Sequence, residues 1–507
     1  MKKSITWVWI ALTVITACIT DKQPTEINPP EIETEVGSRT DTPLIETSTP
    51  EELVTITVVY TNDEHGWMAG EEEGAGAAEL AGLWRTEFPE SDLVLPLSGG
   101  DNWTGPAIST WFEGESMVEA MNAMGYAAAA VGNHEFDFNM SGLATRTSQA
   151  NFPYLGANIE YKVAGDIPAD LGIQPYTILD TSGLQIGIIG LANQDTPSVT
   201  NPLYVSAFEF KDYETALRDY VPQVREAGAD LVLVPGHICE WELSQLARDV
   251  EDLEIALFGG GHCHELFANK TSNTVLLGGG SNLRSYAFAT YEVATGSGEY
   301  DLIDYGTEQN LGGTPHPQVA EIVAHWQALT DQELDVTIGY LEDEIEQHSD
   351  EMAALITASW LWAYPADVAI TNWGGMRDRI PPGEVTISDI VSVMPFENVL
   401  MDVSLTGEEL GKVLQSGDHL PAIAGLTWEG GKWILTATGE PLDPEATYNL
   451  LVTDFLYAGG DNYRIAEFDP EAYKTATNWR QPVIDWILAQ ESSPEKTLDS
   501  AIQDLIK

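Results

Sequence analysis

Five short segments place side chains able to bind divalent metals directly after an apolar stretch. They read Thr-Asn-Asp-Glu-His-Gly at 61–66, Ser-Gly-Gly-Asp at 98–101, Gly-Asn-His-Glu-Phe-Asp at 132–137, Gly-His at 236–237 and Gly-Gly-His-Cys-His at 260–264. Together they supply two carboxylates, one amide oxygen and four imidazoles, namely Asp63, His65, Asp101, Asn133, His237, His262 and His264. This mixture of oxygen and nitrogen ligands suits borderline divalent ions such as zinc or manganese.

The seven side chains divide into two metal sites that share one carboxylate. We expect one ion to take Asp63, His65, Asp101 and His264, and the other to take Asp101, Asn133, His237 and His262. Two divalent ions about 3.5–4 Å apart form the clamp that stabilises in-line phosphoryl displacement. The pattern therefore predicts a dinuclear phosphohydrolase with Asp101 as the bridging ligand.

His134 is left over from this ligand set and is a candidate catalytic residue. A histidine beside a metal-held phosphate can stabilise developing charge or protonate the leaving oxygen. Asp137 follows three residues later and can hold the imidazole in the useful tautomer while raising its pKa. We therefore assign catalytic roles to His134 and Asp137.

The elements that must position these residues alternate between strands and helices. Short apolar strands are predicted from Val54 and over 92–97, 127–131, 184–191, 231–235 and 255–258, and helices over 213–224 and 241–253. Such alternation predicts an α/β fold. In α/β sheets, ligands bind outside the carboxyl ends of the strands, where the five motifs stand.

Composition excludes several classes of protein. The chain has 507 residues and a formal net charge of −58, with 22 Lys and Arg against 80 Asp and Glu. This balance excludes a general affinity for nucleic acid or for anionic lipid. Three cysteines exclude a disulfide-rich scaffold. Cys239 and Cys263 either pair with each other or are two free buried thiols.

The first 17 residues are predicted to be an export signal. Lys2 and Lys3 precede an apolar run over 5–17, which is shorter than the ~20 residues of a spanning helix. Ile-Thr-Ala-Cys at 15–18 resembles a bacterial lipobox, in which Cys18 carries lipid; the alternative is an ordinary signal peptide cut near Ala17. We expect an extracytoplasmic protein, anchored through Cys18 to the cell membrane or outer membrane, or periplasmic or secreted if it carries no lipid.

The remainder of the chain divides into a tether, two domains and a linker. Residues 18–52 are rich in Pro, Thr and Glu and are predicted to be a disordered tether. A metallophosphoesterase domain is expected over 53–311, a linker helix within 312–335, and a substrate-binding domain over 336–507.

The ordered motifs resemble the calcineurin-like metallophosphoesterase domain of the 5′-nucleotidase family. The resemblance runs from about Leu53 to about Tyr463. It implies a four-layered β-sandwich flanked by helices, followed by a smaller α/β domain. It also implies release of phosphate from nucleotides by attack of a metal-activated hydroxide. The family commonly has Gln where His264 stands, and histidine is a competent replacement.

The same resemblance suggests residues that bind substrate in the second domain. Asn-Trp-Gly-Gly-Met-Arg at 372–377, Pro-Phe at 395–396 and Phe-Leu-Tyr-Ala-Gly-Gly-Asp at 455–461 resemble three family motifs. They imply that Asn372 contacts substrate, that Arg377 holds phosphate, that Phe396 and Phe455 sandwich the nucleobase, and that Asp461 binds the ribose hydroxyls. Aromatic rings clamp a flat base, and Arg is a bidentate phosphate partner.

The chain departs from the family pattern at three places. Trp373 replaces a small residue, and its bulk threatens the base site; Asn462 stands where the family often has glycine. An arginine that the family carries near 349–359 is missing here, and Arg379 is the candidate replacement. Alternative substrates are therefore 2′,3′-cyclic nucleotides, UDP-sugars and simple phosphomonoesters. The alternative from another class is a nucleotide-binding lipoprotein without catalysis.

Overall fold

The computed structural model describes residues 52–71, 74–295 and 297–506, which fall in one compact unit. The predicted signal segment, Cys18 and all of the tether except its last residue lie outside the described residues. Among the described residues, no helix combines the length and hydropathy that crossing a membrane requires.

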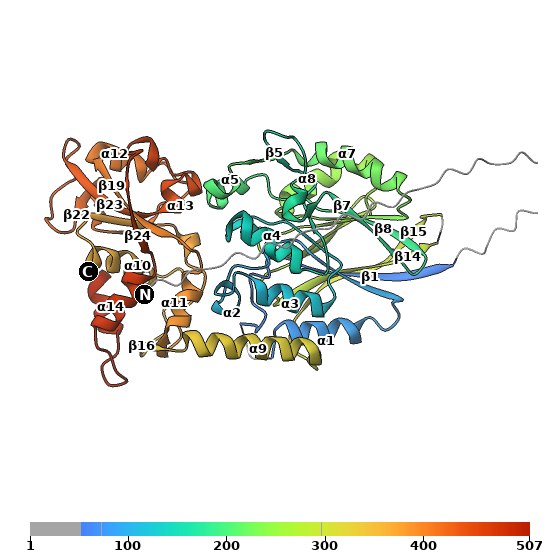
Figure 1. Ribbon diagram of the computed structural model, residues 1–507, viewed down its shortest axis with the longest axis horizontal. Coiled ribbons are helices and arrows are strands. Elements are labelled where there is room, and N and C mark those ends of the chain that lie inside the picture. The colour runs from blue at the N-terminus through green and yellow to red at the C-terminus, as the bar shows by residue number, and fades with distance from the viewer. Residues whose placement is uncertain (1–51, 72–73, 296, 507) are drawn as a thin grey trace, which may run out of the picture. The chain divides into compact units, whose positions relative to one another are not determined.

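Two β-sheets form the centre of the N-terminal half (Figure 1). Among the described residues, the larger has the order β15 (Tyr300–Gln309), β14 (Ser285–Ala294), β1 (Leu53–Thr61), β2 (Leu93–Ser98), β3 (Ala128–Ala130), β4 (Tyr154–Leu155), β6 (Ile173–Gln174). The other has the order β12 (Leu266–Thr271), β13 (Thr274–Gly279), β11 (Leu257–Gly259), β10 (Leu231–Pro235), β8 (Leu184–Ile189), β7 (Tyr176–Thr181). β1, β2 and β3 run parallel to one another, as do β8, β10, β11 and β13.

The sheets pack face to face because their strands are apolar on both faces. In β10, Leu231 and Leu233 join the core between the sheets, whereas Val232 and Val234 pack under helices on the outer face. Strands buried on both sides read as continuous apolar runs rather than alternating patterns. This is why short runs such as 231–235 were recognisable in the sequence, and β10 has the predicted bounds.

Helices cover both outer faces and complete four layers, as Figure 1 shows. α1 (Ala77–Glu87), α3 (Glu115–Met124), α4 (Asn139–Gln149) and α9 (Pro317–Leu334) pack on the larger sheet. α7 (Tyr213–Glu226) and α8 (Glu240–Asp249) pack on the other. The predicted α/β class and its four-layered arrangement are confirmed. The helix predicted over 241–253 is shorter than expected, because α8 ends at Asp249 and a separate 3₁₀ turn follows over Glu251–Leu253.

The C-terminal part has its own sheet and core. Among the described residues, the sheet has the order β20 (Ala422–Ala424), β17 (Val368–Thr371), β23 (Thr447–Thr453), β19 (Val399–Thr406), β24 (Tyr473–Asn478). α10 (Asp350–Ala363), α14 (Gln481–Ala489) and α15 (Asp499–Ile506) pack on one face, and α12 (Gly407–Val413) on the other. The boundaries proposed at 311 and 336 remain predictions.

The linker prediction corresponds to α9, which begins at Pro317 and ends at Leu334. Pro at the first turn costs no backbone hydrogen bond, and the His316 side chain accepts one from the Val319 amide. α9 contacts α1 and α3 of the first part and α11 (Ile387–Val393) of the second. α2 (Ala107–Thr110) also meets α11, where the Ala107 amide donates to the Ser392 hydroxyl. These contacts hold the carboxyl ends of the first domain's strands against the second domain.

Candidate active site

The predicted metal-binding residues converge from both sheets. Loops after β1 and β2 carry Asp63, His65 and Asp101, and the loop after β3 carries Asn133; loops after β10 and β11 carry His237 and the pair His262 and His264. Because these strands run parallel within their sheets, their carboxyl ends meet at one edge. A hydrogen bond of 2.9 Å from the Tyr60 hydroxyl to the Gly260 carbonyl joins the two sheets there.

The first group of ligand atoms surrounds the Asp63 carboxylate. Asp63 Oδ1 lies 3.8 Å from His65 Nε2 and 3.6 Å from His264 Nε2, and the two imidazole nitrogens are 3.1 Å apart. His65 Nδ1 meets the Thr104 carbonyl at 3.0 Å, which leaves Nε2 as the ligand atom. These three ligand atoms thus point into one small space. The His264 side chain is 42% exposed, so this space is open to solvent on the side of His264.

The second group surrounds Asp101 and Asn133. His237 Nε2 lies 2.9 Å from Asp101 Oδ2 and 3.1 Å from Asn133 Oδ1, which is also 3.1 Å from His262 Nδ1. His237 Nδ1 meets the Gly99 carbonyl at 2.8 Å. Among the described residues, three groups of His and carboxylate side chains have ligand atoms within 4.8 Å of one another. They are Asp63, His65 and His264; Asp101, His237 and His262; and His65, Asp101 and His134, so Asp101 belongs to two of them. The donor set fits a pair of divalent metal ions.

Unusual backbone conformations hold these side chains. Positive φ angles occur at Asp63 (51°), His65 (44°), Asp101 (59°), His262 (70°) and His264 (56°). Such angles are uncommon in residues other than glycine and persist where the surroundings over-determine them. Gly132 must be glycine, since a Cβ there would lie 2.2 Å from Asp101 Oδ1. Backbone strain of this kind is typical of ligand-binding sites.

The electrostatics keep three of the four imidazoles neutral. Burial and the charge of Arg377 lower the pKa of His65 and bring the pKa of His264 to about 3. Burial and the charge of His237 bring the pKa of His262 to about 4. Burial alone would also lower the pKa of His237, but the Asp101 carboxylate reverses this and raises it to about 10. A divalent cation competes with that proton for the same nitrogen.

His134 and Asp137 form the predicted pair beside this cluster. His134 Nδ1 lies 2.7 Å from Asp137 Oδ2, and its backbone amide donates to Asp101 Oδ1 at 2.7 Å. His134 Nε2 therefore faces the ligand cluster, 4.0 Å from Asp101 Oδ2. Burial opposes charge on this imidazole, but the carboxylates of Asp137 and Asp101 raise its pKa above the ordinary value. A protonated His134 can donate to an anion held at the cluster.

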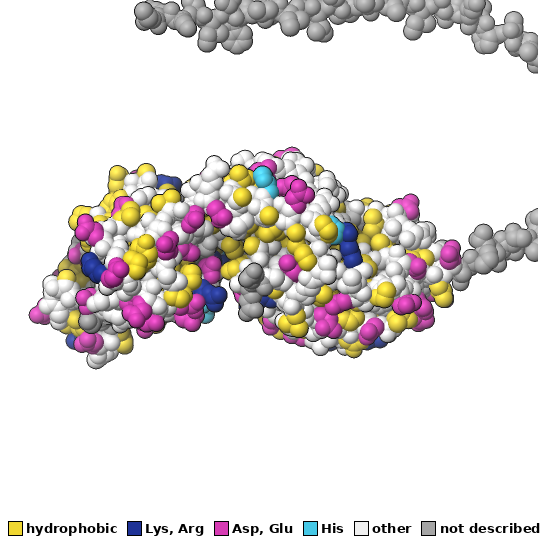
Figure 2. Space-filling model, turned by 90° about the horizontal axis from the view of Figure 1, so that it is seen from below, with side chains coloured by type: hydrophobic (Ala, Val, Ile, Leu, Met, Phe, Trp, Pro, Cys, Tyr) yellow, Lys and Arg dark blue, Asp and Glu magenta, His cyan; other side chains and the backbone are white. Residues whose placement is uncertain are grey.

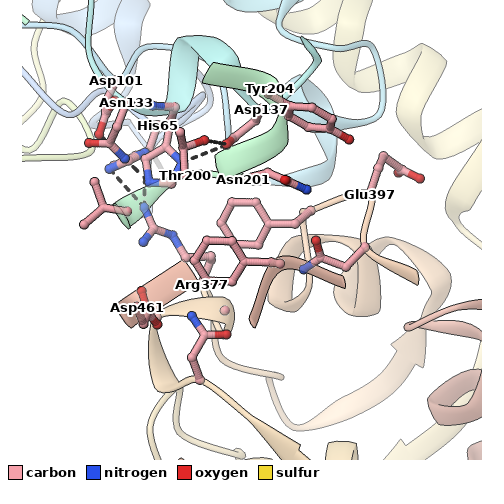
Figure 3. Close-up of a pocket in the computed structure, with 18 of the residues that line it drawn as sticks. His65, Asp101, Asn133, Asp137, Thr200, Asn201, Tyr204, Arg377, Glu397 and Asp461 are labelled. Carbon is pink, nitrogen blue, oxygen red and sulfur yellow. Dashed lines mark hydrogen bonds and ion pairs between the residues drawn. The ribbon is translucent and has the colours of Figure 1, made fainter. Parts of the chain in front are cut away.

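The predicted substrate residues line one cavity of about 210 Å³ beside the cluster (Figure 3). This cavity is lined by all the predicted site residues except the fully buried Asp63 and His237. Arg377 Nη2 approaches His65 Nε2 at 3.1 Å, and the Phe396 ring stacks on the His134 ring at 5.6 Å. Asp461 has a pKa of about 6, raised by burial and lowered in part by its hydrogen bond to Asn372.

The structure places two residues that concern the departures from the family pattern, Trp373 and Arg379. The Trp373 indole donates to the Leu420 carbonyl at 3.1 Å and packs at the margin of the second domain's core, so it does not line the cavity. Arg379 pairs with Glu344 at 3.4 Å and lines a neighbouring cavity of about 410 Å³, which shares His65, His264 and Arg377 with the first.

Sequence reasoning missed residues of two kinds. Thr200, Asn201, Tyr204, Glu397 and Asn398 also line the cavity. Asn398 stands two residues after Phe396, and this spacing was the available signal. Glu64 and Glu135 are buried beneath the ligand loops: Glu135 accepts from the amides of Gly132, Asp101 and Asn102, and Glu64 from the Asn102 side chain at 2.6 Å. Their position inside the metal-binding motifs was the signal for them.

Cys239 and Cys263 form a disulfide, which settles the alternative left open by the sequence. Their Cα atoms are 5.2 Å apart. Cys239 follows His237 by two residues, and Cys263 stands between His262 and His264. The bond therefore joins the two loops that carry three of the predicted metal ligands.

Fold and site together give a four-layered α/β arrangement with a metal-ligand cluster at the carboxyl ends of two facing sheets, as in metallophosphoesterases. Residues 334–467 match the family described as 5′-nucleotidase, C-terminal domain. The chain is 29% identical to a 5′-nucleotidase of Vibrio vulnificus over 476 residues, which cover 80% of this chain and 85% of that protein. It is 26% identical to Protein UshA of Escherichia coli, over 80% and 86% of the two chains.

A solved structure shares the fold. The 5′-nucleotidase precursor from Thermus thermophilus superimposes with a TM-score of 0.74 and 22% sequence identity, covering 87% of this chain and 97% of that chain. These comparisons confirm the resemblance predicted from the motifs. The chain is similar to 5′-nucleotidases over most of its length, and its residues 334–467 match the C-terminal domain of their family.

Proposed function

We propose that this protein is a metal-dependent 5′-nucleotidase that releases inorganic phosphate from nucleoside phosphates. One observation carries the proposal: five of the seven predicted ligands and the His134–Asp137 pair line the same cavity as Phe396, Phe455 and Asp461. A site for phosphoryl chemistry and a site for a nucleoside are therefore continuous. A nucleotide-binding lipoprotein would need the cavity but not the intact ligand set, so the enzyme is the better reading.

Each group has a defined task in this hydrolysis. Two divalent ions, zinc or manganese, would be held by the two ligand groups and supply phosphoryl polarisation and an activated water. Arg377, whose guanidinium reaches the edge of the cluster, would donate to the phosphoryl oxygens. His134 Nε2 would donate to the developing charge or protonate the leaving oxygen, while Asp137 holds the opposite nitrogen.

The second domain would supply recognition of the nucleoside. Phe396 and Phe455 would take the base between their rings, and the Asp461 carboxylate would accept from the ribose hydroxyls. The metal ions would contact only a phosphoryl group, which nucleotides share with every other candidate substrate. Selectivity would therefore come from these three side chains.

The surface fits a role for discrete small substrates rather than polyanions. Figure 2 shows acidic side chains spread over the face in view and only a few basic ones, in keeping with the net charge of −58. Such a surface repels nucleic acid, whereas a nucleotide needs only the local positive charge of the site.

The decisive experiment is phosphate release from a substrate panel with added zinc or manganese. The panel contains nucleoside mono- and diphosphates, 2′,3′-cyclic nucleotides, a UDP-sugar and a simple phosphomonoester. We expect nucleoside 5′-monophosphates to be among the best substrates by kcat/KM. Binding of AMP without turnover under every metal condition would instead identify a binding protein.

We also propose an extracytoplasmic location with a lipid anchor at Cys18. The support is the lipobox-like sequence at 15–18 and the tether that follows it. In a bacterial host, the full chain should partition into detergent, and the Cys18→Ser variant should appear in the aqueous fraction. Equal partitioning of both would favour an ordinary signal peptide.

A further inference from the structure

The Asp137 carboxylate is held by two partners, one on each oxygen. Oδ2 contacts His134 Nδ1 at 2.7 Å, and Oδ1 accepts a hydrogen bond of 3.2 Å from the Thr200 hydroxyl. Thr200 is 63 residues away in sequence and is only 2% exposed. A buried hydroxyl is thus aimed at the back of the catalytic pair.

Two bonds restrain this carboxylate in a way that one cannot. The terminal torsion of an Asp side chain is broad and roughly twofold, so a single hydrogen bond leaves the carboxylate plane free to swing. Bonds on both oxygens fix that plane, and the plane of the carboxylate sets the plane of the imidazole that it holds. The Thr200 hydroxyl therefore acts on where His134 Nε2 points.

The backbone around Thr200 is itself firmly placed. Thr200 directly follows α5 (Thr196–Val199), and its amide donates to the Thr196 carbonyl at 3.1 Å. The next residue, Asn201, caps α6 (Pro202–Val205) by accepting from the Leu203 amide. The hydroxyl thus comes from a junction between two helical turns rather than from a free loop.

The same segment forms a wall of the nucleoside cavity. Thr200, Asn201 and Tyr204 line that cavity, as Figure 3 shows, and α5 contacts the 3₁₀ turn Gly460–Asn462, which carries Asp461. One short segment therefore touches the catalytic pair on one side and the ribose-binding turn on the other.

We propose that Thr200 is a positioning residue, the third member of a Thr200–Asp137–His134 relay that orients the catalytic imidazole. The inference rests on the proposed function, since it assumes that His134 acts on the leaving group. It assigns Thr200 no contact with the reacting atoms.

The test replaces the hydroxyl without changing the shape of the side chain. Hydrogen bonds to charged groups contribute ~1.5–3 kcal/mol, so Thr200→Val should lower kcat for AMP by about 10- to 100-fold. KM and metal content should stay within about twofold of wild type, and Thr200→Ser should restore most of the loss. Ser198→Ala removes a hydroxyl from the same segment. Within the part of the chain that the structure describes, this hydroxyl donates to the Asp195 carbonyl alone, so the variant should leave kcat unchanged.

Three further readouts separate positioning from a general structural effect. The kcat for a small phosphomonoester whose leaving alcohol still needs a proton should fall as much as that for AMP. In the Asp137→Ala variant, the additional substitution Thr200→Val should lower kcat no further. The Nδ1 proton of His134, observed by NMR in histidine-labelled protein, should exchange with water faster in Thr200→Val. Thr200→Ala provides the same loss of hydroxyl if the valine variant folds poorly.

The outcomes divide cleanly. Full additivity with Asp137→Ala, a loss confined to AMP, or an unchanged kcat in Thr200→Val would each overturn the relay while leaving the proposed function intact. Absence of nucleotide hydrolysis by the wild-type protein would overturn both.

Discussion

Arg377 Nη2 lies 3.1 Å from His65 Nε2, although the two residues are 312 positions apart and belong to different domains. His65 Nε2 is also the atom that points into the first ligand group. A guanidinium and a metal ion repel each other, and an anion between them offsets this repulsion by attracting both. The position of Arg377 therefore suits a side chain that binds a phosphoryl group held at the metals.

The first prediction concerns this arginine. Arg377→Gln should weaken inhibition by inorganic phosphate by about 10- to 100-fold, the loss expected for hydrogen bonds between charged partners. Metal content should not change, because Arg377 is not one of the predicted metal ligands. The matched control is Arg379→Gln, which lies in the neighbouring cavity and pairs with Glu344. An equal loss in both variants would make Arg379 a second phosphate-binding residue.

The ligand cluster was accessible from sequence because each ligand follows a strand that can be read locally. His237 is separated from the apolar run 231–235 by one glycine, and Asp101 follows the run that ends near Leu97. Parallel strands carry such positions to one edge without further information. The structure accordingly brings all seven side chains together.

The cavity wall could not be read in the same way. Thr200 acquires its relation to Asp137 from a contact across 63 residues, and no local period or motif signals that contact. Glu64 and Glu135 were passed over because burial of a carboxylate depends on donors from other loops, such as the amides that surround Glu135. For Trp373 the sequence suggested a conflict with the base site that the structure does not have. Tertiary packing directs its indole to the Leu420 carbonyl, and this could not be predicted from the sequence.

Metal removal gives the second prediction. A chelator should abolish activity, and zinc or manganese should restore it. The metals bind only the folded chain, so saturation at 100 times Kd should add about 2.7 kcal/mol per bound ion to the free energy of unfolding. This appears as a rise in Tm between the chelated and the loaded protein. Asp101→Asn is the control and should show a much smaller rise, and full activity in excess chelator would contradict the metal assignment.

The third prediction separates catalysis from metal binding. His134→Ala should lower kcat by roughly 10²–10⁴-fold, the range for a general acid or charge-stabilising group. Elemental analysis should find its metal content intact, since the imidazole is held by Asp137 rather than by the predicted ligand groups. Asp101→Ala should instead lose metal. Wild-type turnover in His134→Ala would refute the role given to this residue.

The disulfide leads to the fourth prediction. Cys263 is exposed and stands between two predicted ligands, so the bond to Cys239 fixes the spacing of three imidazoles. The double variant Cys239→Ser and Cys263→Ser should lose metal affinity by about 10–100-fold, as when the outer partners of ligands are removed. Treatment of the wild type with a phosphine reductant should lower metal affinity in the same way, and treatment of the double variant should not change it. Equal metal affinity in the wild type and the double variant would show that hydrogen bonds are enough to hold the ligand loops, such as the one from the Gly261 amide to the Ile238 carbonyl.

The last prediction concerns nucleoside recognition, and Phe455 is a cleaner probe than Phe396. The Phe396 ring stacks on His134, so its removal would disturb catalysis as well as binding. Phe455 belongs to α13 (Asp454–Tyr457) and lies over the Gly460 backbone, where an added Cβ would come within 2.3 Å of its ring. Its ring is thus placed by the turn that carries Asp461 and does not depend on the catalytic pair.

Stacking on an aromatic ring contributes ~1–3 kcal/mol per base, so Phe455→Ala should lower kcat/KM for AMP by about 5- to 150-fold. Hydrolysis of a small phosphomonoester should barely change, because that substrate does not reach the ring. Phe455→Tyr keeps the ring and should keep most of the activity on AMP. Equal fractional losses on both substrates would indicate a folding effect. No loss on either would show that the base does not stack on Phe455, and the enzyme would then be a general phosphomonoesterase.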